Sequence, residues 1–479
     1  MNIDNFIPYL FIAAYLIFTL VIGIGTSKAQ SNTPQEYFLA NRKIGNIVLF
    51  FTLAATNFSS FAFLGFAGAG YRVGISYYPM MAFSGAFLGV LFYLIGYKVW
   101  LLGQEKGFIT PSELIAERLG SQSLKIIFLT VMVIFTLPYL ALQPIGAGYL
   151  LENLTNGQIP YFFGATVLTF AIVIYVFMGG MRSVVLTDVL QGILMFVLMI
   201  VAVFTIANSL GGITAANRAA YEQLPELFSR QGVDNFFTKA KWFSYMVLWI
   251  LCVPMFPQMF MRFYIPKTPT PLKVSAVLYP LITTIIFICP VLIGVWAHIP
   301  FPNLVGKATD RAMPMMLAEY TPVWVASFVM VGALAAFMST LDSQLLALSS
   351  MLTRDVYISY LRPNASLREQ TLIGKVLIVI LAIIGLIIAY NPPFTILAIA
   401  QAAFTGLAVL FPTVIAALYG KNINSFSCII SIIVGELMLI GFQLNIIPES
   451  FTFGFLPVVP IIVISTLIIV LGSVFSKNM

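Results

Sequence analysis

Charged residues are scarce in this chain. Only 9% of its 479 residues are Asp, Glu, Lys or Arg, whereas 60% are hydrophobic. Because soluble domains carry about 25% charged residues, this composition excludes an ordinary soluble globular protein. The sequence therefore predicts an all-helical integral membrane protein in contact with lipid.

Histidine and cysteine are also nearly absent. The single histidine, His298, and the three cysteines, Cys252, Cys289 and Cys428, show no paired spacing. They form neither a metal-ligand pattern nor a nucleophile and base arrangement. We expect the cysteines to be small core residues, and we predict that the protein is not an enzyme.

Long apolar runs are abundant. A span needs about 20 apolar residues, and about thirteen such runs can be counted. They cover residues 6–26, 48–72, 77–101, 124–151, 159–180, 183–208, 242–263, 272–296, 320–352, 371–390, 394–419, 425–445 and 455–475. Asp4 stands where a signal peptide would have basic residues, so the first run is predicted to be a span. We expect no appended signalling domain.

The net charge of +7 is interpreted as a signature of topology. With the N-terminus outside, most of the 24 basic residues fall in cytoplasmic loops, among them Lys28, Arg262 and Lys477, as the positive-inside rule requires. The sequence therefore predicts a multi-pass protein of the inner (plasma) membrane with a cytoplasmic C-terminus. A nucleic-acid partner is not expected.

Two of the spans contain helix-breaking residues. Ser59, Ser60 and three glycines between positions 65 and 70 lie in the second run, and Pro254 and Pro257 lie in the seventh. Interrupted spans at corresponding positions are typical of inverted-repeat transporters, whose binding site lies at the breaks. The alternative is that these residues serve close helix packing or a simple kink.

Carboxylates inside apolar runs are the second functional signal. Ser339, Asp342 and Ser343 share one helix face, and Asp188 lies inside the sixth run. Their hard oxygen donors suit Na⁺, and an ionisable residue in a span indicates an ion or substrate path. A lone hydroxyl often bonds the carbonyl one turn back, but that does not explain Asp342. Glu436, in a late span, can equally face lipid or a second copy.

A passive channel is the main alternative to a transporter. Channels are built around repeated pore rings, and no such repeat occurs in this sequence. We therefore interpret the chain as a cation-coupled transporter.

Two segments resemble the sodium:solute symporter family. They are residues 335–346 (AAFMSTLDSQLL), which run on to 355–357 (DVY), and residues 179–191 (GGMRSVVLTDVLQ). The resemblance covers essentially the whole chain and implies a leucine-transporter-type core of two inverted five-helix repeats. It assigns 1–30 to an extra N-terminal span, 48–208 to the first repeat, 242–419 to the second, and 425–479 to two C-terminal spans.

The resemblance also implies ion ligands. The family's shared sodium site would take the backbone carbonyls of Ala55, Phe58 and Ala336 and the hydroxyls of Ser339 and Thr340. A second sodium site, present in some relatives, corresponds to Asp188, Ser339, Asp342 and Ser343. Asp342 departs from the pattern, because those relatives have serine there. Two neighbouring carboxylates require either a second cation or a proton.

The solute is expected between the two breaks. The candidate residues are Ser59, Ser60, Phe61, Gln143, Trp249, Gln258 and Gln401. Gln401 matches a substrate-binding glutamine of sugar-transporting relatives, and Gln143 matches a glutamine of the pantothenate permease pattern. Either amide can instead join helices.

The apolar seventh run favours a small, partly apolar carboxylate over a sugar. Its carboxylate would sit at a half-helix N-terminus, because no Lys or Arg is expected deep in the core. The overall likeness is to the pantothenate and monocarboxylate branch, in 345–350 (LLALSS), 391–393 (NPP) and 457–460 (PVVP). The sequence thus predicts Na⁺-coupled import of a carboxylate such as pantothenate or a monocarboxylate. A sodium/amino acid symporter of the proline type and a proton-coupled transporter are the alternatives.

Overall fold

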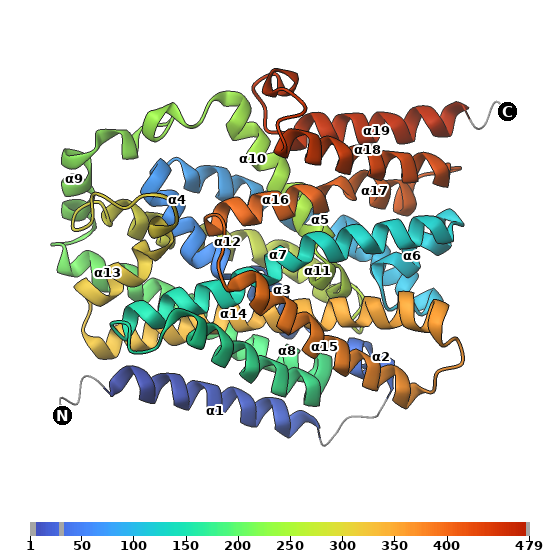
Figure 1. Cartoon of the computed structure of the whole chain (residues 1–479), viewed down its shortest axis with the longest axis horizontal. Helices are drawn as coiled ribbons and strands as arrows, with labels where there is room; N and C mark the ends of the chain where they lie inside the picture. The colour runs from blue at the N-terminus through green and yellow to red at the C-terminus, as the bar shows by residue number, and fades with distance from the viewer. Residues whose placement is uncertain (1–5, 28–32, 476–479) are drawn as a thin grey trace.

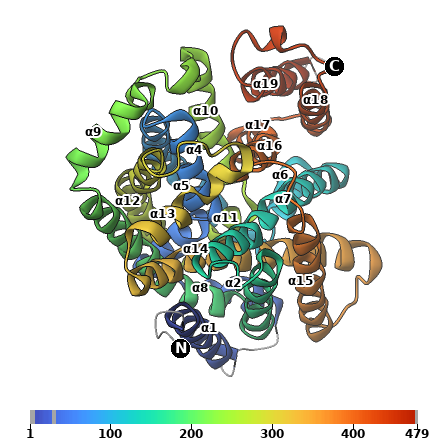
Figure 2. The same ribbon diagram turned by 60° about the vertical axis from the view of Figure 1, so that its left-hand side comes forward.

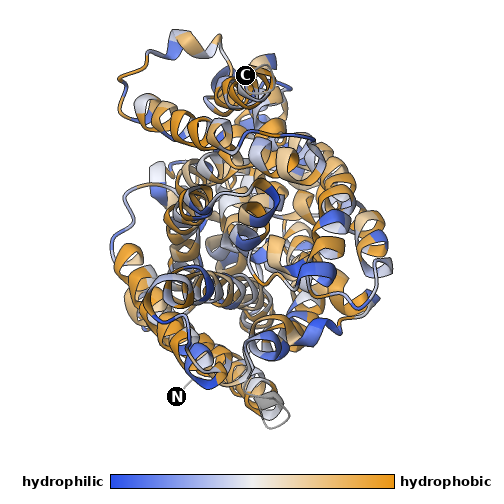
Figure 3. Ribbon diagram, turned by 90° about the vertical axis from the view of Figure 1, so that its right-hand side faces the viewer, coloured by the Kyte–Doolittle hydropathy of each residue, from blue (hydrophilic) through white to orange (hydrophobic). Residues whose placement is uncertain are grey.

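The computed structural model describes residues 6–27 and 33–475. Lys28, Lys477 and the outer ends of the predicted segments 1–30 and 425–479 lie outside the described residues. The long helices pack side by side, with α1 (Ile7–Ser27) along one edge and α18 (Ser425–Gln443) and α19 (Val458–Phe475) along another (Figure 1). Hydrophobic residues predominate along the outer helices, and polar residues are more frequent at helix ends, in loops and toward the interior (Figure 3). The all-helical prediction is confirmed.

The remaining principal elements follow in chain order. They are α2 (Pro34–Leu39), α3 (Asn46–Asn57), η3 (Phe61–Gly65), α4 (Phe66–Val73), α5 (Tyr77–Lys106), α6 (Pro111–Leu119), α7 (Gln122–Leu154), α8 (Tyr161–Ser209), α9 (Ile213–Gln223), α10 (Lys239–Cys252), α11 (Pro257–Arg262), α12 (Thr270–Trp296), η7 (Gly306–Arg311), α13 (Ala312–Tyr320), α14 (Val323–Met351), η8 (Leu352–Leu361), α15 (Leu367–Ala389), α16 (Ile396–Val409) and α17 (Phe411–Tyr419).

The spanning helices that the structure describes are fewer than the thirteen predicted runs, because the runs 159–180 and 183–208 form one long helix, α8, and the run 242–263 is divided between α10 and α11. Among the described residues, 10 helices are long and apolar enough to cross a membrane, and α3 with η3 and α4 forms a further span bent by 59°. The 49 residues of α8 would extend about 74 Å if straight, more than twice the bilayer core. Gly180, with φ 52° and ψ −149°, interrupts this helix, as expected between the runs 159–180 and 183–208.

The first predicted break is present between α3 and η3. Phe58 adopts an extended conformation, with φ −85° and ψ 93°, directly after the last residue of α3. The Ser60 N–H donates to Gln143 Oε1 at 3.0 Å, and the Ser60 hydroxyl donates to the Leu142 carbonyl at 2.7 Å. Helix α7 therefore supplies hydrogen-bond partners that the interrupted helix lacks.

The second predicted break separates α10 from α11. A single 3₁₀ turn, Val253–Met255, follows α10, and Phe256 is extended with φ −61° and ψ 127°. Pro254 and Pro257 each stand at the start of a short helix, where a missing N–H costs no hydrogen bond. Both interruptions predicted from the sequence are confirmed.

Helix α14 forms the centre of the molecule (Figure 2). Every residue from Val329 to Met351 is buried, and the helix packs against α3, α7, α8 and α11. A polar residue on α14 therefore faces protein on all sides and must find its partners there.

Helices α4 and α12 pack with their backbones nearly in contact. A Cβ atom at Gly294 would lie 1.9 Å from the Ala67 carbonyl oxygen, and one at Gly70 would lie 2.3 Å from the Val291 carbonyl oxygen. Because no real Cβ approaches backbone so closely, any larger residue must push the two helices apart.

We expect Gly294→Ala to destabilise the protein by about 1–3 kcal/mol, the usual cost of overpacking. Thermal unfolding in detergent measures this effect. The control is Gly25→Ala in α1, since a Cβ there meets nothing within 4 Å. Equal unfolding temperatures for Gly294→Ala and wild type would show that α4 and α12 separate without cost.

Candidate functional site

Oxygen atoms converge where α3 ends against α14. The Ser339 hydroxyl lies 2.8 Å from the Ala55 carbonyl oxygen and 3.0 Å from that of Ala336. The Thr340 hydroxyl lies 3.2 Å from the Ala336 oxygen and 3.4 Å from the Phe58 oxygen. The five predicted ligands of the shared sodium site are thus brought together.

The break in α3 explains why these carbonyls are available. Helix α3 ends at Asn57, and the Phe58 N–H closes its last turn on the Ala54 carbonyl, so the carbonyls that follow Ala54 have no N–H one turn ahead to accept from. The Thr340 hydroxyl donates to one of them, Thr56, at 3.0 Å. Unwound carbonyls and helix C-terminal ends are the groups that coordinate Na⁺ in transporters with broken helices. The cluster is buried and formally uncharged, which suits one monovalent cation.

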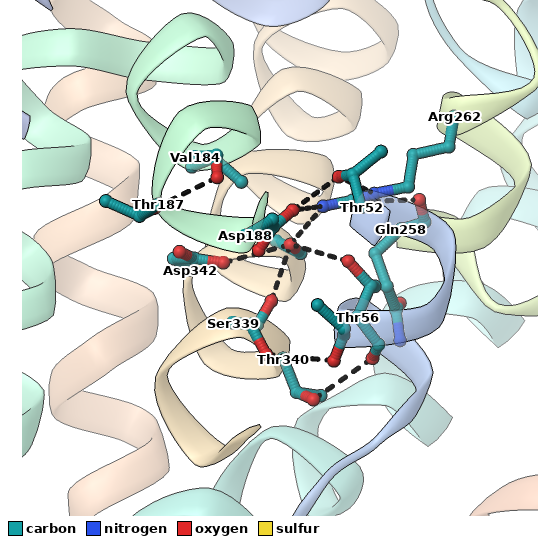
Figure 4. Close-up of polar contacts among 12 residues, drawn as sticks. Thr52, Thr56, Val184, Thr187, Asp188, Gln258, Arg262, Ser339, Thr340 and Asp342 are labelled. Carbon is teal, nitrogen blue, oxygen red and sulfur yellow. Dashed lines mark hydrogen bonds and ion pairs between the residues drawn. The ribbon is translucent and has the colours of Figure 1, made fainter. Parts of the chain in front are cut away.

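The second predicted cluster contains a cation of the protein itself. The Arg262 guanidinium reaches from α11 toward Asp188 and Thr52 (Figure 4). Its Nη2 lies 2.8 Å from Asp188 Oδ2 and also donates to the Ser343 hydroxyl. Its Nε donates to Thr52 Oγ1 at 2.8 Å, and its Nη1 donates to the Gln258 carbonyl at 3.0 Å.

The expectation that no Lys or Arg lies deep in the core is therefore wrong. Arg262, which was assigned to a cytoplasmic loop, is the last residue of α11 and is fully buried. A buried charge is tolerated only when it is paired and its hydrogen-bond donors are satisfied. Partners from four helices, α3, α8, α11 and α14, meet that requirement here.

Asp342 lies beside this ion pair and has different partners. The Tyr175 hydroxyl donates to Asp342 Oδ2 at 2.6 Å, and the Ser343 hydroxyl lies 2.9 Å from Oδ1. Ser343 also lies 2.7 Å from the Ser339 carbonyl oxygen, which connects the two clusters. The structure thus brings Asp188, Asp342 and Ser343 together around Arg262.

A small cavity lies between the two breaks. Its volume is about 30 Å³, and it is lined by Asn57, Phe61, Ala62, Phe66, Met81, Ser84, Gly85, Leu88, Tyr139, Trp249, Val253, Phe256, Phe287 and Phe404. Two predicted solute residues, Phe61 and Trp249, are in this wall, with ring centroids 5.1 Å apart. The volume has room for little more than a water molecule, so aromatic side chains must move before a solute can enter.

The other predicted solute residues lie outside this cavity wall. Ser60 and Gln143 bond each other, and the Gln143 amide also donates to the Tyr139 carbonyl. Gln401 accepts a hydrogen bond from the Tyr245 hydroxyl at 3.2 Å. The Ser59 hydroxyl is buried, and no hydrogen bond of it is seen among the described residues.

Gln258 is the remaining predicted solute residue. It is fully buried, and its amide atoms have no hydrogen-bond partner among the described residues.

Several residues of the site were missed from the sequence. They are Thr52, Tyr139, Tyr175, Arg262 and Phe404. Arg262 had a usable signal, since it follows Gln258 by four residues and therefore shares its helix face after the second break. The aromatic residues had none, because an aromatic residue in an apolar run is typical of any core.

Another ion pair, between a partly exposed arginine and a buried aspartate, lies at the far end of α4. Arg72 Nη1 lies 3.7 Å from Asp310 Oδ1 and also donates to the Thr309 hydroxyl. Asp310 Oδ2 accepts from the Ile396 N–H at 2.8 Å, so η7 links α4 to the start of α16. Burial raises the pKa of Asp310 to about 6, against the opposing effects of the Ile396 N–H and Arg72.

This pKa predicts a pH-dependent stability. Because its pKa is raised, the folded protein binds the Asp310 proton more tightly than the unfolded chain does, and this binding stabilises the folded state. The stabilisation is complete below about pH 3.9 and is lost as the pH rises to 6. Asp310→Asn removes the charge. We expect the free energy of unfolding of this variant to exceed that of wild type by about 3 kcal/mol above pH 6 and to equal it near pH 4.

Thermal unfolding at several pH values between 4 and 7 checks this prediction. Glu319→Gln, which neutralises an exposed carboxylate on α13, is the control and should follow wild type. Parallel pH profiles for wild type and Asp310→Asn would contradict it.

Comparison with known proteins identifies the family. The model of the sodium:solute symporter family matches residues 37–435. The chain belongs to this family. Sodium/pantothenate symporters are similar to it: that of Escherichia coli (strain K12) is 26% identical over 484 residues, covering 100% of this chain and 98% of the relative. That of Haemophilus influenzae is 27% identical over 438 residues, covering 91% and 89%.

A sodium/proline symporter of Staphylococcus aureus (strain bovine RF122 / ET3-1) is similar to the same degree. It is 26% identical over 488 residues, covering 99% of this chain and 94% of the relative. The pantothenate and proline symporters therefore stand at comparable distance from this chain.

Solved structures agree on the fold. A Na⁺-coupled sialic acid symporter superimposes with a TM-score of 0.82 at 17% identity, covering 99% of this chain and 98% of the other. MHP1, a nucleobase-cation-symport-1 family transporter, gives 0.60 at 12% identity, covering 94% of both. The leucine-transporter-type fold is confirmed. This symporter is a multi-pass plasma membrane protein, not an enzyme, and Na⁺ is its coupling ion.

Proposed function

We propose that this symporter imports a small organic carboxylate, such as pantothenate or a monocarboxylate, together with Na⁺ by alternating access. Na⁺ binds to the carbonyls of Ala55, Phe58 and Ala336 and the hydroxyls of Ser339 and Thr340. The N-terminus is outside and the C-terminus is cytoplasmic.

The contact between α14 and the end of α3 carries this proposal. The Ser339 and Thr340 hydroxyls already meet the carbonyl oxygens that the break exposes, within 3.4 Å. A cation bound there would hold the two helices together. Because α3 also leads into the cavity wall at Phe61, ion binding at this point stabilises the wall that contacts the solute.

The cavity favours a partly apolar solute. Its wall is dominated by aromatic and aliphatic side chains, and only Asn57, Ser84, Tyr139 and the Trp249 indole N–H contribute polar side-chain groups. A sugar would leave most of its hydroxyls unpaired in such a wall. We propose that the carboxylate of the solute binds at the start of the segment formed by η3 and α4, because a helix N-terminus favours negative charge.

A proline-type amino acid is the second candidate. Sodium/proline symporters are as similar to this chain as the pantothenate symporters are. Proline is also a small carboxylate with an apolar ring, so the cavity wall alone does not separate the two solutes.

Uptake by proteoliposomes tests the proposal. Labelled pantothenate, short monocarboxylates, proline and a sugar are supplied under an imposed Na⁺ or H⁺ gradient. We expect uptake of a carboxylate driven by Na⁺, and reciprocal tightening of Na⁺ and solute binding, since coupling free energies are mutual. Equal solute affinity in Na⁺ and in choline would reject Na⁺ symport, and preference for the sugar would reject the carboxylate.

A further inference from the structure

Arg262 occupies the place where a second cation would bind. Three of its hydrogen-bond acceptors are Asp188 Oδ2, Ser343 Oγ and Thr52 Oγ1. Asp188 and Ser343 belong to the set that the sequence assigned to a second Na⁺. The guanidinium thus already contacts one carboxylate oxygen and one hydroxyl of the set of residues that such an ion would need.

Charge repulsion prevents both cations from sharing this position. Two unit charges at contact distance repel each other far more strongly in a protein interior than in water, because the interior has a lower effective dielectric constant. Asp188 already balances the charge of Arg262 through the 2.8 Å ion pair. Asp342 is satisfied by the Tyr175 and Ser343 hydroxyls and needs no metal ion to complete its hydrogen bonds.

We propose that the Arg262 guanidinium is the resident cation of this second position and takes the place of a second Na⁺, so that one Na⁺ accompanies each solute. The inference rests on the proposed sodium site at Ser339 and Thr340.

Arg262 also has a positioning role. Thr52 precedes the break of one interrupted span and Arg262 follows the break of the other, so the guanidinium joins the two half-helices on the same side of the cavity. Its contact with Ser343, which lies 2.7 Å from the Ser339 carbonyl, reaches the helix segment that holds the sodium site. If α3 and α11 separate to open the cavity on this side, the hydrogen bonds and the ion pair of Arg262 must break first.

The number of Na⁺ ions bound tests the inference. Equilibrium binding of radioactive Na⁺ to purified wild type should give about one ion per protein with a Hill coefficient near one. In Arg262→Ala, the vacated oxygens of Asp188, Thr52 and Ser343 should bind a second Na⁺, and Na⁺ should raise its unfolding temperature more than that of wild type.

Two further variants separate charge from structure. Arg262→Lys keeps the positive charge and should bind one Na⁺, as wild type does. Arg368→Ala removes an exposed arginine at the start of α15 and should leave both the ion count and the Na⁺-dependent stabilisation unchanged. A merely structural role for Arg262 would lower stability without adding an ion.

Each measured ion count either supports or overturns the inference about Arg262. Two ions in wild type, or one in folded Arg262→Ala, would overturn the inference while leaving the proposed sodium site intact. Failure of wild type to bind Na⁺ would reject the proposed function itself. If Arg262→Ala does not fold, the counts for wild type and Arg262→Lys decide, with one ion supporting the inference and two overturning it.

Discussion

Ser339→Ala and Thr340→Ala are each expected to raise the Na⁺ concentration for half-maximal uptake by about tenfold to a hundredfold. Each removes one oxygen ligand, worth about 1–3 kcal/mol, from the cluster at the end of α3. Maximal uptake at saturating Na⁺ should change far less, because the solute contacts remain. Uptake measured over a range of Na⁺ concentrations at fixed solute gives both quantities.

Ser349→Ala is the matched control for these variants. Ser349 is a buried hydroxyl on the same helix, but it lies 3.0 Å from the Leu346 carbonyl of its own helix. We expect its Na⁺ dependence to equal that of wild type. Unchanged Na⁺ dependence in Ser339→Ala and Thr340→Ala, at normal membrane expression, would remove both residues from the ion site.

Asp188→Asn is expected to destabilise the protein by about 3–5 kcal/mol, because it leaves the buried Arg262 charge without its counter-ion. Combining Asp188→Asn with Arg262→Gln removes both charges, and most of the lost stability should return. Chemical or thermal unfolding of the two single variants and the double variant forms a double-mutant cycle that measures the coupling.

The pair of Glu113 and Arg354 provides the control. These residues are 3.0 Å apart but partly exposed, so Glu113→Gln should cost about 1 kcal/mol or less. Additive effects of Asp188→Asn and Arg262→Gln would show that the two side chains do not form a coupled pair in the membrane.

Two ion pairs, one fully buried and one partly exposed at Arg72, lie near the two halves of the first interrupted span. Helices α3 and α4 flank the first break. The pair of Arg262 and Asp188 joins segments that adjoin α3. The pair of Arg72 and Asp310 joins α4 to η7. Alternating access requires one side to open while the other stays closed. We expect each pair to open in turn during transport.

The sequence by itself determined the architecture. Its apolar runs were long enough to predict the spans, because a bilayer fixes the length of a spanning helix. Pro254, Pro257 and the Ser59–Ser60 pair located both breaks, since these residues act on the backbone locally. The hydroxyls of Ser339 and Thr340 lay on the interior helix that the structure places at the centre.

Only the tertiary structure decided which partners the buried charged and polar side chains have. Arg262 is 74 positions from Asp188 and 81 from Ser343. Its spacing from Gln258 indicates a shared helix face, but it does not show which distant side chains that face meets. Tyr175 and Asp342 meet across 167 positions for the same reason. A helix end is set by nearby residues, but the partner of a buried charge is set by how distant helices pack, because only a complete set of acceptors offsets the loss of water.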